Sequence, residues 1–512
     1  MPSTVRDVVR DRIAGLDDGS RSLLQIAATV GRDVDLGLLA RAAGLDGQTT
    51  LDRLEPLEAL GLLGPAPGDP YSVRFAHDLV RESVAESTPR STASRLHLRV
   101  ADALQSNIPD GDAVAESLAH HLWAAGPLAD PARTTEALVR AARRAANMAA
   151  FEAANRQLES AVQLARSAGL AALELSALSL LAIVVRRQAR YRGSAFDVLV
   201  RAEQLARHLG REAQAADFLY IRWIASAHAA KTDRDQLVHR LRDQGEASAD
   251  PLVRAYGRQA WGLYQWEVGN IGEAFRHMTG NDRTVSDASA RGDLDAHRRD
   301  VQLPWPCLRA MATALHGDVD TARTLLDSVE ADATDDPYMT SVWAYYTGIV
   351  ASMVGDPAWG QHAVKRWLAS DPEQFFVHVD PYMRQTRCWT RALTGVDPAG
   401  AAAEAEELLA ATLLDPPRWG LAFYCGLIGE MLLAAGMPDR AAAALDRADR
   451  FLDAHGQRYS EGLLLLLRAQ TLNARGERAT VVRAAAERAR QLSVDREAHL
   501  FAHRAERFLA TL

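Results

Sequence analysis

Lysine and cysteine are scarce in this chain of 512 residues. Lys231 and Lys365 are the only lysines among 58 basic side chains, and the rest are arginine. Because no glycine–lysine pair exists, the GxxxxGK[ST] loop that cradles nucleotide phosphates is absent from the sequence. Cys307, Cys388 and Cys425 lie far apart and outside any CxxC spacing, which argues against a disulfide framework or a zinc site built on cysteine. This cysteine usage fits a reducing cytoplasm, where we expect the protein to be located.

Long apolar segments are also missing. Residues 1–20 carry a charge every few positions and no apolar core, which excludes a secretory signal. The longest apolar run, LSALSLLAIVV at residues 175–185, is shorter than the about 20 residues that span a bilayer. It therefore predicts a buried helix, and we expect no membrane association. Apolar residues recur at spacings of three and four, whereas alternating runs are almost absent, so the chain is predicted to be nearly all helical.

An excess of basic charge is lacking as well. The net charge is -8, and residues 1–90 hold 14 acidic against 10 basic side chains. In the segment 48–61, which would enter a DNA groove, Asp52, Glu55 and Glu58 stand against Arg53 alone. Contacts to phosphate require the opposite sign, so we expect no direct nucleic-acid binding by this chain.

The first 130 residues show a distinct pattern of short elements. Three helical segments at 17–31, 34–44 and 48–61 precede a Pro/Gly/Asp turn between short apolar runs at 62–76, which predicts a β-hairpin. Three helices followed by a hairpin describe a winged-helix domain, predicted over residues 17–90. Residues 1–16 are expected to be a helix that remains from a linker, and 91–130 a helical connector.

From residue 131 to 512 the sequence repeats itself. Gly317, Gly355, Gly395, Gly436 and Gly476 follow one another at separations of 38, 40, 41 and 40 residues, each between two helical segments. This period predicts an α-solenoid of tetratricopeptide-like helical hairpins, about eight or nine in number. Small or apolar residues fall where paired helices come close, namely Leu138, Ala141, Ala142, Ala145, Ala154, Leu158, Ala161, Gly262, Gly269, Ala274, Met278, Gly429, Leu432, Ala441, Leu445 and Ala448. Residues 280–300 break the period and predict a loop or a long helix connection.

No grouping of side chains indicates catalysis. GxSxG, HExxH and EF-hand patterns are absent, so we expect a protein that is not an enzyme. His120 and His121 are adjacent, and adjacent side chains on a helix point about 100° apart, so we expect that they do not share a metal ion. His499 and His503 have the i, i+4 spacing but no third ligand, which favours surface or packing roles. We therefore predict neither a metal nor a cofactor for this chain.

Nine of the ten tryptophans lie between residues 223 and 419. One interpretation is that their rings fill holes between repeats, because aromatic side chains dominate core contacts. The other is that some of them, with nearby arginines, bind an effector or partner, because tryptophan and arginine are enriched at binding hot spots. On this second interpretation the candidate surface consists of Trp223, Arg222, Trp261, Arg258, Trp305, Trp343 and Trp389.

The order of the N-terminal segments resembles a known family. The run from TVRDVVRDRIAGL through LDRLEPLEALGLL, VRFAHDLVRESV and RLHLRVADAL to AESLAHHLWAAG is similar to the region after the ATPase core of large bacterial signal-transduction NTPase (STAND) transcriptional regulators, of the SARP type or the large LuxR type. The resemblance covers residues 1 to about 165. It implies a P-loop ATPase, a winged helix and a tetratricopeptide sensor array, with the ATPase module supplied in cis before Met1 or in trans.

The resemblance also implies a role for one histidine. His77, in a motif of the F-x-H-x-L type with Phe75 and Leu79 as packing residues, would face bound nucleotide and stabilise an inactive state, with Arg74 and Arg81 on either side. ATP or ADP would then be a cofactor only where the ATPase module is present. The alternative is that His77 only forms hydrogen bonds within the wing.

Two functions follow from these features. The first is the sensor and protein-interaction part of an ATP-dependent transcriptional regulator, which binds a protein, peptide or small-molecule effector on the array and relays binding through the winged helix. Such a protein could also form homo-oligomers. The alternative is a stand-alone tetratricopeptide scaffold that binds a partner protein without nucleotide.

Overall fold

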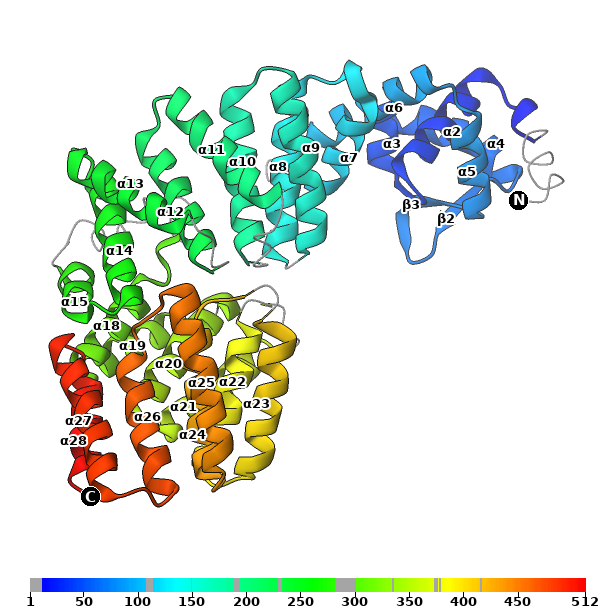
Figure 1. The fold of residues 1–512 in the computed structure, drawn as a ribbon. Helices are drawn as coiled ribbons and strands as arrows, with labels where there is room; N and C mark the ends of the chain where they lie inside the picture. Colours follow the sequence, from blue (N-terminus) through cyan, green and yellow to red (C-terminus); the bar gives the residue numbers. More distant parts are fainter. Residues whose placement is uncertain are drawn as a thin grey trace. The chain divides into compact units, whose positions relative to one another are not determined.

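Helical hairpins make up most of the chain. A computed structural model describes residues 12–106, 114–148, 150–187, 194–228, 233–280, 301–333, 336–372, 376, 379–414 and 417–512. Consecutive helices pack side by side along an α-solenoid, which is preceded by a small module that contains the strands (Figure 1). The prediction of an all-α solenoid of tetratricopeptide-like hairpins is confirmed. The predicted N-terminal helix and the irregular segment after Gly280 fall largely on residues 1–11 and 281–300, which lie outside the described residues.

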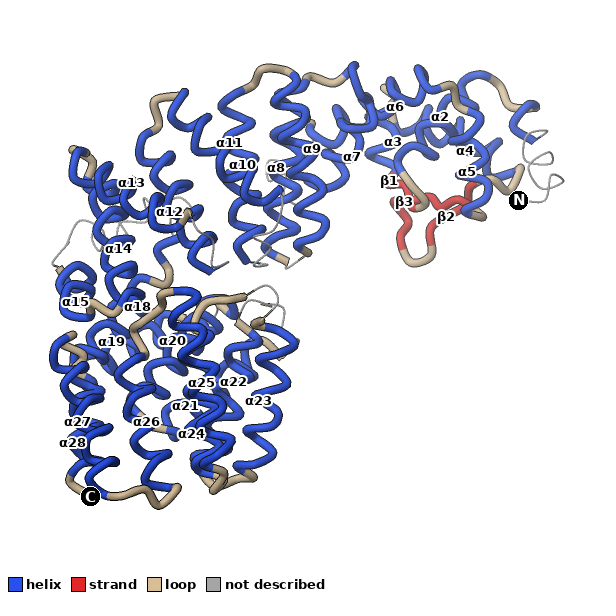
Figure 2. The backbone as a smooth tube through the Cα atoms, in the orientation of Figure 1, coloured by secondary structure: helices blue, strands red, loops and turns tan. Residues whose placement is uncertain are grey.

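The N-terminal module combines helices with a small antiparallel sheet. Its elements are α2 (Asp18–Val30), β1 (Asp33–Asp35), α3 (Leu36–Ala43), α4 (Gly47–Ala59), β2 (Leu63–Ala66), β3 (Asp69–Phe75) and α5 (Asp78–Ser87). The sheet has the order β1-β3-β2, with β3 paired antiparallel to both neighbours (Figure 2). The hairpin predicted at 62–76 is confirmed. Strand β1 was not predicted, because three residues are too few to show an alternating pattern.

Short polar residues set the boundaries of these helices. Asp17, Asp35 and Asp46 each precede a helix and accept hydrogen bonds from its first backbone N–H groups, which have no partner within the helix. Gly44 ends α3 with a φ of 66°, a left-handed conformation that favours glycine. The helices and strands enclose a core that includes the buried side chain of Phe75, so the end of β3 and the start of α5 are fixed in place.

The next helices connect this module to the repeats. They are α6 (Arg90–Gln105), α7 (Ala115–Ala125), the short 3-10 turn η1 (Gly126–Leu128), α8 (Pro131–Asn147), α9 (Phe151–Ser167) and α10 (Ala171–Arg187). The helices predicted in the connector are confirmed as α6 and α7. The chain divides into two compact units, residues 1–184 and 185–512, within α10. The predicted boundaries after residues 90 and 130 stay predictions.

The second unit consists of helices alone within its described residues. They are α11 (Ser194–His208), α12 (Glu212–His228), α13 (Arg234–Ala247), α14 (Pro251–Val268), α15 (Ile271–Thr279), α18 (Trp305–His316), α19 (Val319–Asp332), α20 (Pro337–Val354), α21 (Pro357–Ser370), α22 (Asp380–Leu393), α23 (Pro398–Thr412), α24 (Leu421–Ala434), α25 (Pro438–His455), α26 (Glu461–Ala474), α27 (Ala479–Asp495) and α28 (His499–Leu509). None of the described helices of the chain is long and apolar enough to cross a membrane.

The repeat glycines lie where the sequence period predicts. Gly317, Gly355, Gly395, Gly436 and Gly476 all have positive φ, between 70° and 120°, and each separates two paired helices. Within the hairpins, other glycines allow close packing.

One such glycine is Gly262, where an added Cβ would stand 2.9 Å from Cγ of Met278. Another is Gly429, where it would stand 3.3 Å from Cγ of Leu445. The predicted close approach of the two helices is confirmed at both places.

Candidate functional site

His77 occupies the junction between β3 and α5. It is the residue before α5, its side chain is exposed, and it makes no capping hydrogen bond to the helix. On one side Arg74 forms an ion pair and hydrogen bond with Asp33 of β1. On the other side Arg81 lies 3.8 Å from Glu82. The arginines that flank His77 in the sequence are thus each beside a carboxylate.

Of the two predicted packing residues beside His77, one packs and one does not. Phe75 is buried in the core of the module. Leu79 is 41% exposed, so the prediction that it packs to fix His77 is wrong. Val80 and Val84, four residues apart, form the buried face of α5, and this rotates Leu79 about 100° away from the core.

Three of the predicted surface tryptophans are buried. Trp223, Trp343 and Trp389 have exposed fractions of 0%, 1% and 0%, so these rings are not part of the surface of the described structure. Trp389 donates a hydrogen bond from Nε1 to Glu430 at 2.8 Å. Their burial favours the interpretation that these rings fill the space between helices.

Trp261 lies at the surface with polar and aromatic neighbours. Its half-buried ring contacts Tyr264 and His239, at centroid distances of 5.5 Å and 5.2 Å. The guanidinium of Arg242 lies 4.5 Å from the ring centroid, a cation–π geometry. Arg258 is exposed one helical turn before Trp261. We call these five residues the Trp261 patch.

The remaining candidates take part in internal contacts. Half-buried Trp305 donates a hydrogen bond from Nε1 to the hydroxyl of Tyr220 at 3.0 Å. Arg222 pairs with the buried carboxylate of Glu203. Arg207 and Arg240 also contact that carboxylate, each at 2.8 Å. Arg222 therefore neutralises a buried charge between α11 and α12 rather than extending into solvent.

A set of contacts joins the C-terminal helices to the helix turns after α14, α18 and α20, and we call it the closure seam. Its C-terminal side comprises Arg458, Tyr459, Arg496, Glu497, His499 and Arg504, and Trp419 joins it from the segment before α24. Its other side comprises Arg234, Trp266, Glu267, Gly269, Gly272, Arg276, Gly317 and Gly355. The second unit thus closes on itself through residues more than 100 positions apart.

Three turn glycines lie next to residues near the C-terminus, and the two sets follow the same order along the chain. An added Cβ on Gly269 or Gly317 would stand 3.0 Å from the nearest atom of Arg496 or His499, respectively. At Gly355 it would stand 3.5 Å from the guanidinium of Arg504.

Arg504 anchors the last helix at the third of these turns. Its Nη1 donates to the carbonyl oxygen of Met353 at 2.7 Å, where the last carbonyls of α20 lack partners within the helix. Its Nη2 donates to Glu430 at 2.8 Å. The side chains of Arg504 and Glu430 are only 10% and 11% exposed, so this ion pair is largely desolvated.

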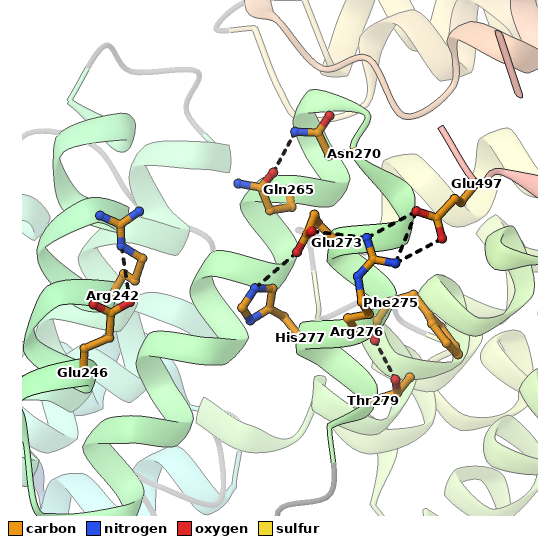
Figure 3. A network of polar contacts seen from close by, with 10 residues as sticks. All are labelled: Arg242, Glu246, Gln265, Asn270, Glu273, Phe275, Arg276, His277, Thr279 and Glu497. Carbon is orange, nitrogen blue, oxygen red and sulfur yellow. Dashed lines mark hydrogen bonds and ion pairs between the residues drawn. The ribbon is translucent and has the colours of Figure 1, made fainter. Parts of the chain in front are cut away.

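A polar network crosses the seam at α15 (Figure 3). Arg276 donates to both carboxylate oxygens of Glu497, at 3.2 Å and 3.1 Å, and also to Glu273 at 3.2 Å. The backbone N–H of Gly272 donates to the carbonyl of Arg496 at 3.3 Å. Gly272 admits Glu497 here, because an added Cβ would stand 2.0 Å from its carboxylate oxygen.

Aromatic rings and one buried carboxyl group form the inner part of the seam. The ring of Trp266 stacks on Tyr459 at a centroid distance of 3.6 Å, and Trp419 lies 5.6 Å from Trp266. Trp419 donates from Nε1 to Oε1 of Glu267 at 2.9 Å. Burial raises the pKa of Glu267 to about 7, although Arg234, at 3.5 Å, and the Trp419 hydrogen bond both act to lower it.

The two C-terminal histidines lie in different surroundings. His499 is half-buried against Gly317, and its ring lies 5.2 Å from that of His316. His316 stacks in turn on Phe275 at 4.0 Å. His503 is exposed. These positions agree with the packing and surface roles predicted for the pair.

His120 and His121 lie close to a third histidine that sequence reasoning did not connect with them. His120 and His121 of α7 meet His97 of α6, and one ring nitrogen from each of the three lies within 4.8 Å of the others. Adjacent residues on one helix do point apart, but a third ring from a neighbouring helix lies between their directions. This cluster could not be predicted from the sequence, because His97 is 23 residues from His120 and no motif joins them.

The closure seam was also missed by sequence reasoning. Trp419 and Glu267 are 152 residues apart, and neither belongs to a recognised motif. The signal that could have suggested the seam is a glutamate within the apolar stretch WGLYQWEVG, where an unpaired carboxylate would be costly to bury.

Comparison with known proteins finds similar chains among solved structures alone. No family model and no curated protein matches the sequence. Among solved structures, the chain is similar to a Signal Transduction ATPase with Numerous Domains (STAND) protein with a tetratricopeptide repeat sensor from Pyrococcus horikoshii, with a TM-score of 0.30 and 12% identity over 97% of this chain and 65% of that one. It is also similar to the TPR domain of P58(IPK), with a TM-score of 0.25 and 14% identity over 82% of this chain and 98% of that one. This chain spans less than two thirds of the STAND protein. Because both TM-scores lie below 0.5, the fold class rests on the helical hairpins of the chain itself.

Proposed function

We propose that this chain is the sensor and protein-interaction part of an ATP-dependent transcriptional regulator of the signal-transduction NTPase type. Residues 17–90 would be its winged helix, which the element order α2-β1-α3-α4-β2-β3-α5 and the sheet order β1-β3-β2 support. The repeat array would bind an effector or partner, and the winged helix would relay that binding to an ATPase module in cis or in trans.

The observation that carries this proposal is the position of His77. Its imidazole is exposed at the start of α5, while buried Phe75, two residues earlier, fixes the backbone that presents it. Backbone N–H groups at a helix N-terminus favour anions, and an imidazole can donate a hydrogen bond to a phosphate oxygen. His77 is therefore suited to contact a nucleotide held by a second module.

A reconstitution experiment tests this role. The chain is combined with the P-loop ATPase module, fused in cis or added in trans, and the release of bound ADP is measured together with transcriptional output. We expect His77→Ala to raise basal activity and to speed the release of ADP, because the contact that stabilises the inactive state is lost.

Leu79→Ala is the matched control, since Leu79 is an exposed neighbour on the same helix. It should leave both readouts unchanged. Equal ADP release by His77→Ala and the wild-type chain would rule out the nucleotide-contact role.

The scaffold function is supported by a different observation. The Trp261 patch joins a half-buried tryptophan to two arginines, a combination that is enriched in protein-binding hot spots. Under this alternative the chain would bind its partner equally well with ATP, with ADP and without nucleotide. Trp261→Ala should then weaken the complex, whereas nucleotide-dependent binding would favour the regulator.

A further inference from the structure

The three histidines of the connector hairpin form a compact cluster within the first unit. His97 lies on α6, and His120 and His121 lie on α7, which packs against α6. The Nδ1 atoms of His97 and His121 are 2.9 Å apart. The ring of His120 lies 5.7 Å from that of His97 and 5.1 Å from that of His121, measured between centroids.

A hydrogen-bonded pair of rings would explain only part of this cluster. One neutral imidazole can donate from Nδ1 to the Nδ1 lone pair of another, which accounts for His97 and His121. It does not include His120, although a ring nitrogen of His120 also lies within 4.8 Å of nitrogens of the other two rings. Three converging nitrogen ligands are, in contrast, what a metal site supplies.

The protonation state of the rings also suits metal binding. Burial and, to a smaller extent, the neighbouring His97 and His120 together lower the pKa of His121 to about 3. Burial likewise lowers the pKa of His97. A metal ligand must be a neutral imidazole with a free lone pair, and burial favours the neutral form of both rings.

We propose that His97, His120 and His121 bind one divalent transition-metal ion of the Zn²⁺ class. Imidazole ligands suit Zn²⁺, Cu²⁺ and Ni²⁺ rather than Mg²⁺ or Ca²⁺. Zn–N bonds of about 2.0–2.1 Å in a tetrahedron place the nitrogens about 3.3 Å apart, so small side-chain rotations would bring the cluster to this geometry. Because His120 is exposed, the fourth position faces solvent and takes a water molecule.

Metal binding at this place would stabilise the helical connector formed by α6 and α7. Helix α6 packs against α2 and α3 of the N-terminal module, and α7 packs against α8, where the repeats begin. A metal ion that links α6 to α7 therefore stabilises the hairpin through which the module meets the first repeats. This role is independent of the proposed nucleotide contact, because His77 does not belong to the cluster.

Metal titration of the full chain, produced without a polyhistidine tag and stripped with EDTA, tests the site. Zn²⁺ binding is measured by calorimetry, and Co²⁺ binding by its visible absorption, which is intense for tetrahedral coordination. We expect one ion per chain and a higher melting temperature with metal, because ligands that bind only the folded state stabilise it. His120→Ala should weaken binding at least about 100-fold, since loss of a direct ligand costs more than loss of a supporting contact.

His120 is exposed, so its replacement should leave folding intact, as a circular dichroism spectrum checks. His97→Gln provides a second ligand variant. The matched control is the double variant His499→Ala and His503→Ala, which removes the other closely spaced histidines of the chain. Absence of binding by the wild-type chain, or equal affinity in the His120→Ala variant, would overturn the proposal, as would loss of binding in the control alone.

Discussion

At the scale of single residues, the carboxyl group of Glu267 makes the stability of the closure seam depend on pH. It is 1% exposed, and its Oε2 accepts no hydrogen bond from any described residue, although Arg234 lies 3.5 Å away. Ionising such a group in the folded protein is costly, and burial accordingly raises its pKa from 4.5 to about 7. The neutral form of Glu267 is therefore the form that the seam accommodates best.

We expect ionisation of Glu267 to lower the stability of the second unit, relative to a Glu267→Gln variant, as pH rises from 5 to 8. A raised folded-state pKa means that the stabilising contribution is complete below pH 4.5 and is lost as pH rises through about 7. The shift corresponds to on the order of 3 kcal/mol. Glu267→Gln should remove this pH dependence. Denaturant titrations at several pH values, followed by tryptophan fluorescence, measure the effect, since nine of ten tryptophans belong to the second unit.

Glu404→Gln serves as the control for this titration. Burial acts to raise the pKa of Glu404, but hydrogen bonds from Arg387 and Arg391 bring this pKa below its ordinary value. The Glu404 carboxylate therefore stays ionised throughout this pH range. The control variant should keep the wild-type slope between pH 5 and 8. A Glu267→Gln variant with that same slope would show that another group titrates.

Single residues were predicted from the sequence only where local pattern determines them. The place of His77 between a strand and a helix follows from neighbouring residues, and the structure confirms it. Whether Trp261 is half-buried and Trp389 fully buried depends on which helices pack against each ring. That information lies in distant segments, so the sequence alone left both interpretations of the tryptophans open.

At the scale of elements, helices α13 and α14 pack with their backbones in near contact. An added Cβ on Gly257 would stand 2.8 Å from the carbonyl oxygen of Leu241 and 3.2 Å from Cα of Gly245. Backbone atoms cannot rotate away as a side chain can, so the helices would have to separate. Gly245 and Gly257 therefore determine the distance between these helices.

We expect Gly257→Ala to lower the free energy of unfolding of the second unit by up to about 2 kcal/mol. Overpacking costs about 1–3 kcal/mol, and the better helix propensity of alanine offsets about 1 kcal/mol of that. Gly429→Ala is the comparison, because its Cβ would meet the flexible side chain of Leu445 at 3.3 Å. Denaturant titration should find the Gly429 variant close to wild type and the Gly257 variant clearly less stable.

Helix α28 depends on one arginine for its attachment. Arg504→Ala would remove donors from the end of α20 and leave Glu430 largely buried without its cation. Breaking a buried ion pair in this way costs about 3–5 kcal/mol. Hydrogen exchange of α28 should become much faster in this variant, whereas Arg507→Ala, which alters an exposed arginine of the same helix, should not change it. Slow exchange in both variants would assign the attachment to apolar contacts instead.

Repeated elements were easier to predict than single ones. The hairpin turns at Gly317 through Gly476 could be located because glycine recurs at a nearly constant separation. Strand β1 has three residues and no repeat, and its register with β3 depends on the partner strand. The sequence therefore predicted the hairpin β2-β3 but not the third strand beside it.

At the scale of the whole molecule, aromatic packing rather than surface charge determines whether the seam stays closed. Arg276 and Glu497 are 53% and 42% exposed, and exposed ion pairs contribute little to stability. Trp266, Trp419 and Tyr459 are 0%, 5% and 2% exposed, and truncation of a buried aromatic side chain costs about 3–5 kcal/mol. The inner rings thus contribute more to the stability of the seam than the exposed Arg276–Glu497 pair does.

We expect Trp419→Ala to open the seam and Arg276→Ala to leave it closed. The backbone N–H groups of Gly272 and Arg458 donate across the seam, to Arg496 and Glu267, so they report its opening directly. Hydrogen exchange of the peptides that contain these two amides should accelerate in the tryptophan variant only. Equal acceleration in the Arg276→Ala variant would mean that ion pairs, rather than aromatic packing, keep the seam closed.

Long-range closure could not be predicted from the sequence. Periodicity defines each hairpin and its neighbour, and both are local properties of about 40 residues. The contact between the first and last hairpins of the closed part depends on the small rotation added at each repeat, which no motif encodes. The repeat class was therefore predictable, whereas the closed arrangement was not.

The turn glycines Gly269, Gly317 and Gly355 also restrict how many hairpins the second unit can contain. Arg496, His499 and Arg504 meet these turns in order only because a set number of hairpins separates them. An insertion or deletion of one hairpin between α20 and α26 would carry α28 past its three turns and break every contact of the seam at once. Related chains should therefore differ in hairpin number before α13, while the length from α14 to α28 stays constant.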